Sequence, residues 1–352
     1  MRKKYEFTGE TLLWQGHTLQ RIRRISDGVL GGFIEHERNL SHYGASWISL
    51  TSKVWGDAQV LDNASVHGNV QVRDNAIISD NATLFDNVEV FGHAQISGFA
   101  SMRNFAVANN NAILRDNAIM FDNTYIDSQA VVGGLAVLRN FSGVTENAIV
   151  MDATLQDSTL VAGSARVLGN NMTIWGGFSL ISGRALLTGS CAIINSTVIQ
   201  DAQVHGNVRL ASSIITNSAK VFDRCSISNM EIFGNAEIFG SATLTGLTGA
   251  VISKVGDNVR IFDHARVTAV AGTSPCQGNA QIYERAEINP NGLVQDNARV
   301  FGNASISGTV LANAVVSGHG IVTAAGSVGW NTVVIGRTQV NTVLGDIPLI
   351  SR

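Results

Sequence analysis

The chain has 352 residues, with 24 Lys and Arg against 27 Asp and Glu, and a formal net charge of −3. This balance excludes both the basic footprint of a nucleic-acid-binding protein and the strong acidity of a nucleic-acid mimic. The 36 Gly and only 3 Pro are typical of a chain with many corners whose short strands keep their amide donors. We find no long apolar run and no signal-peptide pattern, so we expect no membrane span and a cytoplasmic location.

Residues 1–53 form the first predicted element, a capping segment that resembles a β-hairpin. The stretches KYEFTG and TLLWQGHTLQRIRRI predict two or three strands, and GGFIEHERNLSHYGASWI leads into the next element. A stack of repeats needs a cap, because an open terminal coil invites edge-to-edge pairing. His36 and His42 lie near Glu35 and Glu37, but a solvated capping turn explains them better than a metal site, and we expect no metal.

From Val54 to Leu155 the chain repeats a six-residue phrase that begins VWGDAQ, VLDNAS, VHGNVQ and VRDNAI, and we count 17 such hexads without a frame break. The first residue is aliphatic, the third is Gly, Asp or Asn, the fourth is often Asn and the fifth is small. A period of six matches neither a helix nor simple strand alternation, but it fits a short strand followed by a bend. The first residue then points inward, and the second and sixth point outward.

Three hexads make one triangular coil, so residues 54–343 predict an all-β, single-stranded left-handed parallel β-helix of about 16 coils. After Leu155 the phrase slips frame and returns, for example as VHGNVR at 204, IFDHAR at 261 and VFGNAS at 300. One continuous solenoid is favoured over two globular domains. Residues 344–352 are a predicted C-terminal tail.

One predicted face carries a column of aromatic and basic residues at its second positions. Every third hexad contributes one residue to it, namely His67, Phe85, Arg103, Phe121 and Arg139. Stacked about 4.8 Å apart, these groups can make cation–π contacts with one another. They either satisfy one another or present planar groups to a ligand or partner.

The sixth positions change from polar to apolar along the same run. The apolar residues are Val107, Ile113, Ile119, Tyr125, Val131, Val137, Ile149 and Leu155. A contiguous exposed apolar patch marks an interface, so we expect these coils to pack against another subunit in a cyclic homo-oligomer, a trimer or a dimer.

The three cysteines, Cys191, Cys225 and Cys276, are odd in number and lack the spacing of a metal site. We expect buried free thiols in a reducing compartment. The longest interruption of the repeat is TAVAGTSPCQGN, residues 268–279, whose role the sequence does not define.

The leader KYEFTGETLLWQGHTLQRIRRI, the segment GVLGGFIEHERNLSHYGASWI and the following xGNAxV hexads resemble a group of bacterial and phage β-helix proteins. This group includes the enterobacterial YdcK-like proteins, which are catalogued as transferases on the strength of their hexapeptide repeat. The resemblance covers the whole chain and implies a left-handed β-helix. It implies no demonstrated activity, because function belongs to sites and not to folds.

Hexapeptide-repeat enzymes suggest an alternative function, acyl transfer from acetyl-coenzyme A or another acyl-coenzyme A with a His as general base. The candidate bases are His264, just before the 268–279 loop, and the outward-facing His205 and His67. The unbroken hexad run has no loop insertion that could form one side of a cleft. We therefore expect a non-catalytic, cofactor-free binding or scaffold protein. Its expected partners are further copies of itself and an unidentified protein or small molecule, with neither nucleic acid nor membrane. A weaker alternative is a phage protein that sequesters a small host molecule between subunits.

Overall fold

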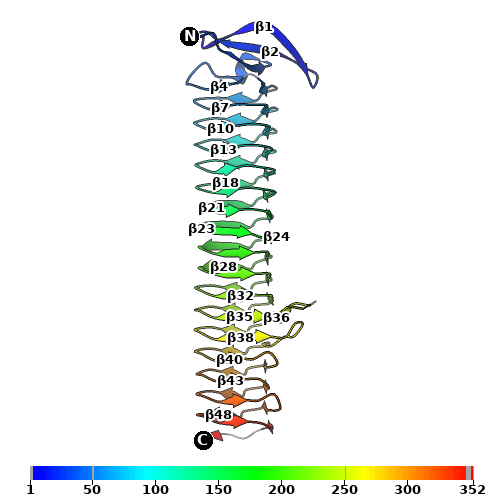
Figure 1. Cartoon of the computed structure of the whole chain (residues 1–352), viewed down its shortest axis with the longest axis vertical. Helices are drawn as coiled ribbons and strands as arrows, with labels where there is room; N and C mark the ends of the chain where they lie inside the picture. The colour runs from blue at the N-terminus through cyan, green and yellow to red at the C-terminus, as the bar shows by residue number, and fades with distance from the viewer. Residues whose placement is uncertain (1–2, 50, 250, 346–349, 352) are drawn as a thin grey trace. The chain divides into compact units, whose positions relative to one another are not determined.

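The computed structural model describes residues 3–49, 51–249, 251–345 and 350–351, and it divides into two compact units, Met1–Phe178 and Ser179–Arg352. Each unit is a stack of short, parallel strands (Figure 1). Among the described residues the only helix is the 3-10 helix η1 (Glu37–Asn39), and no helix could cross a membrane. The predicted parallel β-solenoid is confirmed in both units, and its left-handed winding stays a prediction.

Unit 1 begins with the hairpin that the leader sequence predicts. Strand β1 (Tyr5–Trp14) pairs antiparallel with β2 (His17–Arg24), and β2 pairs antiparallel with β3 (Leu30–Ile34). Strand β3 then pairs in parallel with β5 (Lys53–Val54), the first strand of the repeat. Because β3 belongs to both arrangements, it joins the hairpin to the first coil.

The remaining strands of unit 1 stack in three columns, which we name faces 1A, 1B and 1C. Face 1A continues from β5 through β8 (Gln71–Val72), β11 (Glu89–Val90), β14 (Val107–Ala108), β17 (Tyr125–Ile126), β20 (Gly143–Val144) and β22 (Ser158–Val161). Face 1B comprises β6 (Gln59–Val60), β9 (Ile77–Ile78), β12 (Gln95–Ile96), β15 (Ile113–Leu114), β18 (Val131–Gly133), β21 (Ile149–Leu155) and β23 (Arg166–Trp175). Face 1C comprises β4 (Trp47–Ile48), β7 (Ser65–Val66), β10 (Thr83–Leu84), β13 (Ser101–Met102), β16 (Ile119–Met120) and β19 (Val137–Leu138).

The core of unit 1 follows the hexad. First-position Val72, Ile78 and Leu84 are fully buried, as are fifth-position Ala76 and Ala82. Each aliphatic residue therefore lies in the space between the three faces, where it packs against its counterparts in the coils on either side. The prediction that the first and fifth positions of the hexad lie in the core is confirmed.

Third-position residues turn the corners in the left-handed backbone region. Asp80 has φ 56° and Gly98 has φ 69°. A Cβ atom at Gly98 would lie 2.7 Å from the backbone oxygen of Asp116 in the next coil. Asp and Asn tolerate this conformation and Gly adopts it without strain, which explains the composition of the third position.

The hexad run is one residue shorter than the sequence predicts. In the last repeat, VMDATL, Ala153 and Leu155 are buried, where an unbroken frame would bury Thr154 and Gln156. The corner at Asp152 lacks its fourth-position residue, and Val137 pairs with Thr154 instead of Leu155. Leu155 is therefore a core residue, and its assignment to an exposed interface is wrong.

Unit 2 repeats the three-face plan, and we name its faces 2A, 2B and 2C. Face 2A comprises Leu180 and Ile181 of β24 (Phe178–Ile181), β27 (Thr197–Val198), β30 (Ile214–Ile215), β33 (Met230–Ile232) and β36 (Ser253–Val255), then, after a bridge at Cys276, β41 (Leu293–Val294), β44 (Thr309–Val310), β47 (Ser327–Val328) and β50 (Val343–Leu344). Face 2B comprises β25 (Leu186–Gly189), β28 (Gln203–Gly206), β31 (Lys220–Val221), β34 (Glu237–Ile238), β37 (Arg260–Ile261), β39 (Gln281–Ile282), β42 (Arg299–Val300), β45 (Val315–Val316), β48 (Val333–Ile335) and β51 (Ile350–Ser351). Face 2C comprises β26 (Ala192–Ile194), β29 (Arg209–Ala211), β32 (Ser226–Ser228), β35 (Thr243–Gly246), β38 (Arg266–Ala269), β40 (Glu287–Ile288), β43 (Ser305–Ile306), β46 (Ile321–Val322) and β49 (Gln339–Val340).

The C-terminal tail predicted for residues 344–352 lies partly outside the described residues, because 346–349 and 352 are not described. Within the described part, Leu344 belongs to β50, and Ile350 pairs with Val334 of β48.

Candidate functional site

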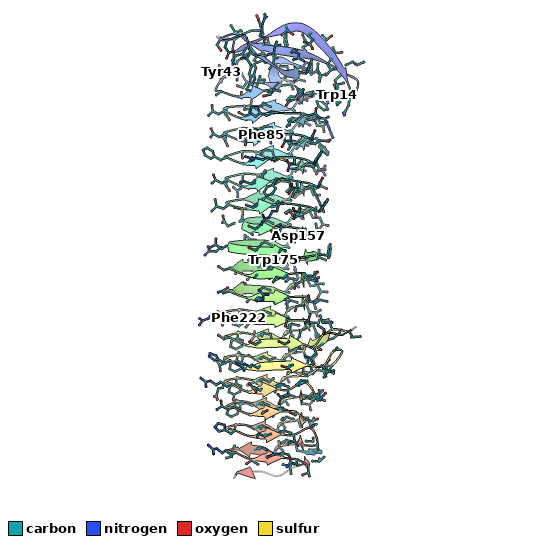
Figure 2. All side chains as sticks on the ribbon, viewed as in Figure 1. Trp14, Tyr43, Phe85, Asp157, Trp175 and Phe222 are labelled. Carbon is teal, nitrogen blue, oxygen red and sulfur yellow. The ribbon has the colours of Figure 1, made fainter. Side chains whose placement is uncertain are left out.

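Face 1C carries the predicted column of aromatic and basic residues. The backbone N–H of His67 donates to Leu84, that of Phe85 to Met102, that of Arg103 to Met120 and that of Phe121 to Leu138. The five residues His67, Phe85, Arg103, Phe121 and Arg139 therefore lie in one column, in successive coils. The rings of His67 and Phe85 stack with centroids 5.1 Å apart, and the Arg103 guanidinium lies 5.2 Å from the Phe85 centroid. Phe85 is marked in Figure 2.

His67 is held within this column and is poorly suited to act as a base. Its Nδ1 atom lies 2.8 Å from Ser49 Oγ, and no carboxylate among the described residues orients its ring. Burial lowers the pKa of His67 below its ordinary value. A neutral, stacked imidazole of this kind is a structural member of the column.

The predicted apolar patch is divided among the three faces of unit 1. Val107 and Tyr125 pair on face 1A. Ile113, Val131 and Ile149 follow one another on face 1B, and Ile119 pairs with Val137 on face 1C. The physical reason is that successive hexads occupy successive faces, so neighbours in sequence are not neighbours on the surface. The sixth positions alone do not form a single contiguous patch.

Face 1C nevertheless gathers exposed apolar residues from another hexad position. The fourth-position residues in the turns on either side of β13 are Phe99 and Phe105, which are 66% and 57% exposed. Those on either side of β19 are Leu135 and Phe141, 68% and 64% exposed. Between them lie Ile119 and Val137, and Phe121 of the aromatic column. We call these seven residues the framed face.

Unit 2 has a longer aromatic ladder on face 2B that we did not anticipate from the sequence. Its members are Phe222, Phe239, Phe262, Tyr283 and Phe301. Successive ring centroids lie 4.7–4.9 Å apart, with interplanar angles of 1–7°. Arg260 and Arg299 flank the ladder, with their guanidinium groups 5.4–5.9 Å from ring centroids. Phe222 is marked in Figure 2. The signal was present, because the second residue is aromatic in VFDRCS, IFGSAT, IFDHAR, IYERAE and VFGNAS.

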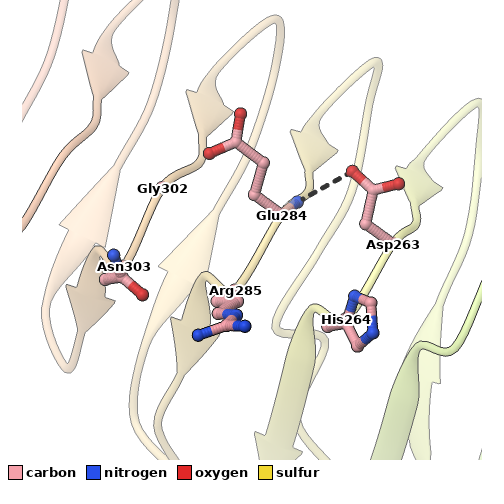
Figure 3. A pocket seen from close by; sticks show the side chains of 6 residues that line it. All are labelled: Asp263, His264, Glu284, Arg285, Gly302 and Asn303. Atoms are coloured by element: carbon pink, nitrogen blue, oxygen red, sulfur yellow. Dashed lines mark hydrogen bonds between the residues drawn. The ribbon is translucent and has the colours of Figure 1, made fainter.

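His264 lines a surface hollow of about 400 Å³ at the corner between faces 2B and 2C. Figure 3 shows His264, Arg285 and Asn303 projecting to the same side from successive coils. Asp263 and Glu284 also line this hollow, and Asp263 accepts a hydrogen bond from the Glu284 N–H at 3.1 Å. An adjoining hollow of about 490 Å³ shares His264, Arg285 and Asn303 and adds Arg266 and Glu287. No residue of the 268–279 loop lines either hollow, so the loop does not wall a site around His264.

The candidate bases lack the partner that general-base catalysis needs. His205 contacts Thr188 Oγ1 at 2.7 Å and Gln203 Oε1 at 3.2 Å, and burial, then the Lys220 charge, lowers its pKa. Within the described part of the chain, none of His67, His205 and His264 contacts a carboxylate at hydrogen-bond or ion-pair distance. His205 and His264 lie three coils apart in unit 2 and do not contact each other, and His67 belongs to unit 1.

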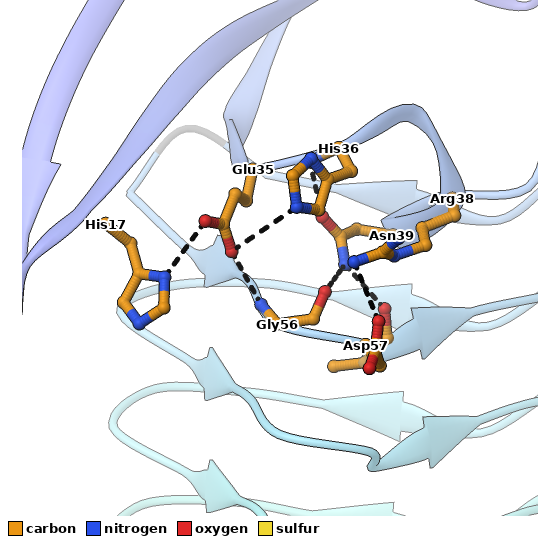
Figure 4. Close-up of polar contacts among 8 residues, drawn as sticks. His17, Glu35, His36, Arg38, Asn39, Gly56 and Asp57 are labelled. Atoms are coloured by element: carbon orange, nitrogen blue, oxygen red, sulfur yellow. Dashed lines mark hydrogen bonds and ion pairs between the residues drawn. The ribbon is translucent and has the colours of Figure 1, made fainter.

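A carboxylate–histidine contact does occur in the cap of unit 1 (Figure 4). Glu35 Oε1 lies 2.9 Å from His17 Nδ1, and Glu35 Oε2 accepts the Gly56 N–H at 2.9 Å. Burial raises the pKa of Glu35, but these hydrogen bonds outweigh it and leave the pKa below its ordinary value. Buried Asn39 donates to the carbonyl oxygens of Gly56 and Ala58. The cluster is explained by the attachment of the cap to the first coil.

The three cysteines are buried and free, as the sequence predicts. Burial raises the pKa of Cys191 to about 11 and that of Cys225 to about 12, and it raises the pKa of Cys276 further still. Thiols of this kind are poor nucleophiles, because the thiolate is the reactive form.

No family model and no curated protein matches this chain in sequence.

Proposed function

We propose that this protein is a non-catalytic β-solenoid that acts as a binding or scaffold protein by associating with further copies of itself. The observation that carries the proposal is the framed face of unit 1. Five of its residues, Phe99, Phe105, Ile119, Leu135 and Phe141, are at least 37% exposed. Single exposed apolar residues are common, but a group of this size on adjoining coils is typical of an interaction surface.

The charges that run through the framed face support a second copy of the chain as its occupant. Arg103 and Arg139 alternate with Phe85 and Phe121 in the column, and the residues after the two phenylalanines are Asp86 and Asp122. Basic and acidic residues therefore alternate from coil to coil, and each sign recurs every second coil. Such an arrangement is self-complementary, because a second copy that is turned or shifted by one coil brings Arg against Asp.

The flatness of the face suits this use. The stacked two-residue strands of face 1C present side chains at regular intervals, so two copies can align over several coils. Interfaces of this kind are enriched in aromatic residues and arginine, which are common among their central anchors. We further propose that the protein belongs with the YdcK-like bacterial and phage β-helix proteins and works in the bacterial cytoplasm, a location that its free thiols favour.

The test compares two double variants on different faces of the same coils. Ile119→Glu with Val137→Glu places two charges on the framed face, whereas Ile113→Glu with Val131→Glu places two charges on face 1B. Both pairs of side chains are adjacent in neighbouring strands. Burying unpaired carboxylates is costly, so we expect the first variant alone to dissociate in light scattering, with unchanged circular dichroism. Dissociation of both variants, or of neither, would contradict the assignment to face 1C.

One observation favours the alternative of a coenzyme-A-dependent acyltransferase, namely the hollow beside His264. Its polar groups could meet an acyl acceptor, and Arg285 and Arg266 could meet phosphate groups. The alternative lacks a carboxylate that orients His264 and a wall from the 268–279 loop. The weaker alternative, capture of a small host molecule between subunits, would need the same self-association.

A further inference from the structure

We propose that the corner between faces 2B and 2C of unit 2 binds a linear, carboxylated polysaccharide. The corner carries fourth-position residues in a single column, which we name the basic corner. Its members are Arg224, Ser241, His264, Arg285, Asn303, His319 and Arg337. This proposal uses unit 2 alone and is independent of self-association through unit 1.

The backbone fixes these residues in one line. The N–H of Arg224 donates to Gly240, that of His264 to Glu284, that of Arg285 to Gly302 and that of His319 to Gly336. Each acceptor immediately precedes the next member of the column, so the members follow one another at about 4.8 Å, the spacing of paired strands. Five of the seven members are Arg or His, and none is acidic.

The basic residues of the column are available to a ligand. Arg224, His264, Arg285, His319 and Arg337 are all exposed. Within the described part of the chain, no carboxylate pairs with Arg224, Arg285 or Arg337, although Arg266 beside them pairs with Glu287 at 3.3 Å. The hollows at His264, Arg285 and Asn303 provide room against the column for a bound chain. Asp263 and Glu284 also line the first hollow, and Glu287, paired with Arg266, lines the second.

Acidic residues adjoin the basic corner, but within the described residues none of them forms an ion pair with a member of the column. Asp223 and Asp263, in the third-position column, accept backbone N–H groups of Gly240 and Glu284 at 2.9 and 3.1 Å. Figure 3 shows Asp263 and Glu284 pointing away from the side on which His264 and Arg285 project. At this corner the third-position residues from Gly302 onward are Gly302, Gly318 and Gly336. Asn303, His319 and Arg337 therefore have no acidic neighbour in their own turns.

The surface on either side of the basic corner identifies the class of polymer. Face 2C presents hydroxyl groups in register, with Ser226 paired with Thr243, and Ser228 with Thr245 and then Thr268. Hydroxyl groups both donate and accept hydrogen bonds, which matches a ligand rich in hydroxyls. On face 2B Phe239, Phe262 and Tyr283 are each stacked on both ring faces, so these three rings offer no free face to a nucleic-acid base.

A carboxylated sugar chain matches both the basic corner and the hydroxyl groups of face 2C. Its carboxylates recur along the polymer and can form charge-assisted, bidentate contacts with Arg285 and its neighbours in the column. Its hydroxyls then lie over the Ser and Thr columns of face 2C. Because several exposed charges act together, binding should weaken as salt screens them.

The test titrates the full-length protein with an oligogalacturonate long enough to span the basic corner, by calorimetry at low ionic strength. We compare Arg285→Gln with Arg337→Gln, on the column, against Arg115→Gln with Arg166→Gln, exposed arginines of unit 1. Both double variants change the net charge equally, and circular dichroism checks that each is folded. We expect the column variant to lose about tenfold or more in affinity and the control to remain near the unmodified protein.

Single-stranded DNA of equal charge is the second arm of the test, and we expect it to bind more weakly than oligogalacturonate. The proposal is overturned if oligogalacturonate does not bind, or if both double variants lose affinity equally. Equal binding of DNA would also overturn it, because the column would then recognise charge alone. Arg285→Lys, which keeps the charge, should recover part of the lost affinity.

Discussion

The carboxylate of Asp80 accepts a hydrogen bond from the backbone N–H of Gly98, 2.9 Å away in the next coil. Both residues occupy the third position of their repeat, and both have positive φ. The same contact recurs between Asp62 and Asp80, and in unit 2 between Asp223 and Gly240. The third-position aspartate therefore has two functions, to turn its own corner and to satisfy an amide of the next one.

Substitution of Asp80 should separate these two functions. Asp80→Asn keeps an acceptor and a tolerance for positive φ, Asp80→Gly keeps only the conformation, and Asp80→Ala loses both. We expect destabilisation to rise in that order, to about 1–3 kcal/mol for Ala. Hydrogen exchange at the Gly98 amide measures the effect locally, with Gln95→Ala on the same coil as the control. Equal protection of Gly98 in all three variants would contradict this role.

In the aromatic ladder of unit 2, we predict that the destabilisation caused by a substitution depends on the position of the residue in the ladder. Phe262→Ala removes two stacked contacts, to Phe239 and Tyr283, whereas Phe222→Ala removes one contact within the ladder. Each aromatic pair contributes about 0.5–1.5 kcal/mol beyond its buried area. We expect Phe262→Ala to lower the free energy of unfolding of unit 2 more than Phe222→Ala does, and the difference should equal the contribution of one aromatic pair. Hydrogen exchange of the face 2B strands measures this difference. Phe262→Leu, which keeps apolar area without stacking, is the control. Equal effects of the two Ala variants would show that stacking adds nothing.

The buried thiols predict a loss of stability at alkaline pH. Burial raises the pKa of Cys191 to about 11 and of Cys225 to about 12 from an ordinary value of 9.0. Above pH 9 the unfolded chain therefore binds fewer protons than the folded protein, so the free energy of unfolding falls as pH rises. The thiols should also resist alkylation until unit 2 opens. Thermal unfolding between pH 8 and about 11, compared with a variant carrying Ala at all three cysteines, measures this effect. If the stability of that variant fell equally steeply with pH, the loss of stability would belong to groups other than the thiols.

Acetyl-coenzyme A should not bind, because no described carboxylate orients His264, His205 or His67 and no loop walls the hollow at His264. Calorimetry with the unmodified protein measures this directly, followed by turnover assays with amine and hydroxyl acceptors. Micromolar binding that is lost in His264→Ala would favour the transferase alternative. Binding that persists in all three His→Ala variants would place the cofactor elsewhere on the surface.

The sequence was sufficient for the core and the columns, because both follow from a fixed period of six. Leu84 is buried and Phe85 lies over Arg103 for that reason alone. It was insufficient at Leu155, because VMDATL fits the hexad by composition while its corner lacks one residue. The signs of the slip were Ala153 at the fourth position and polar Gln156 where the next aliphatic residue was due.

The surface was harder to predict than the core. We placed Ile113 beside Ile119 because they are close in sequence, but the coil assigns them to different faces. The fourth position of the hexad is usually Asn, so the sequence alone did not identify Phe99 of ISGFAS and Phe105 of MRNFAV as parts of an apolar patch. Exposed apolar residues at corners become meaningful only when the faces they border are known.

Self-association through the framed face is the central claim, and sedimentation equilibrium of the unmodified protein over a range of concentrations tests it most directly. The account predicts a mass that is a whole multiple of the monomer mass, and the multiple gives the order of the assembly. The mass should fall to that of the monomer when Ile119 and Val137 are both replaced by Glu. A monomer mass for the unmodified protein at every concentration would contradict the account.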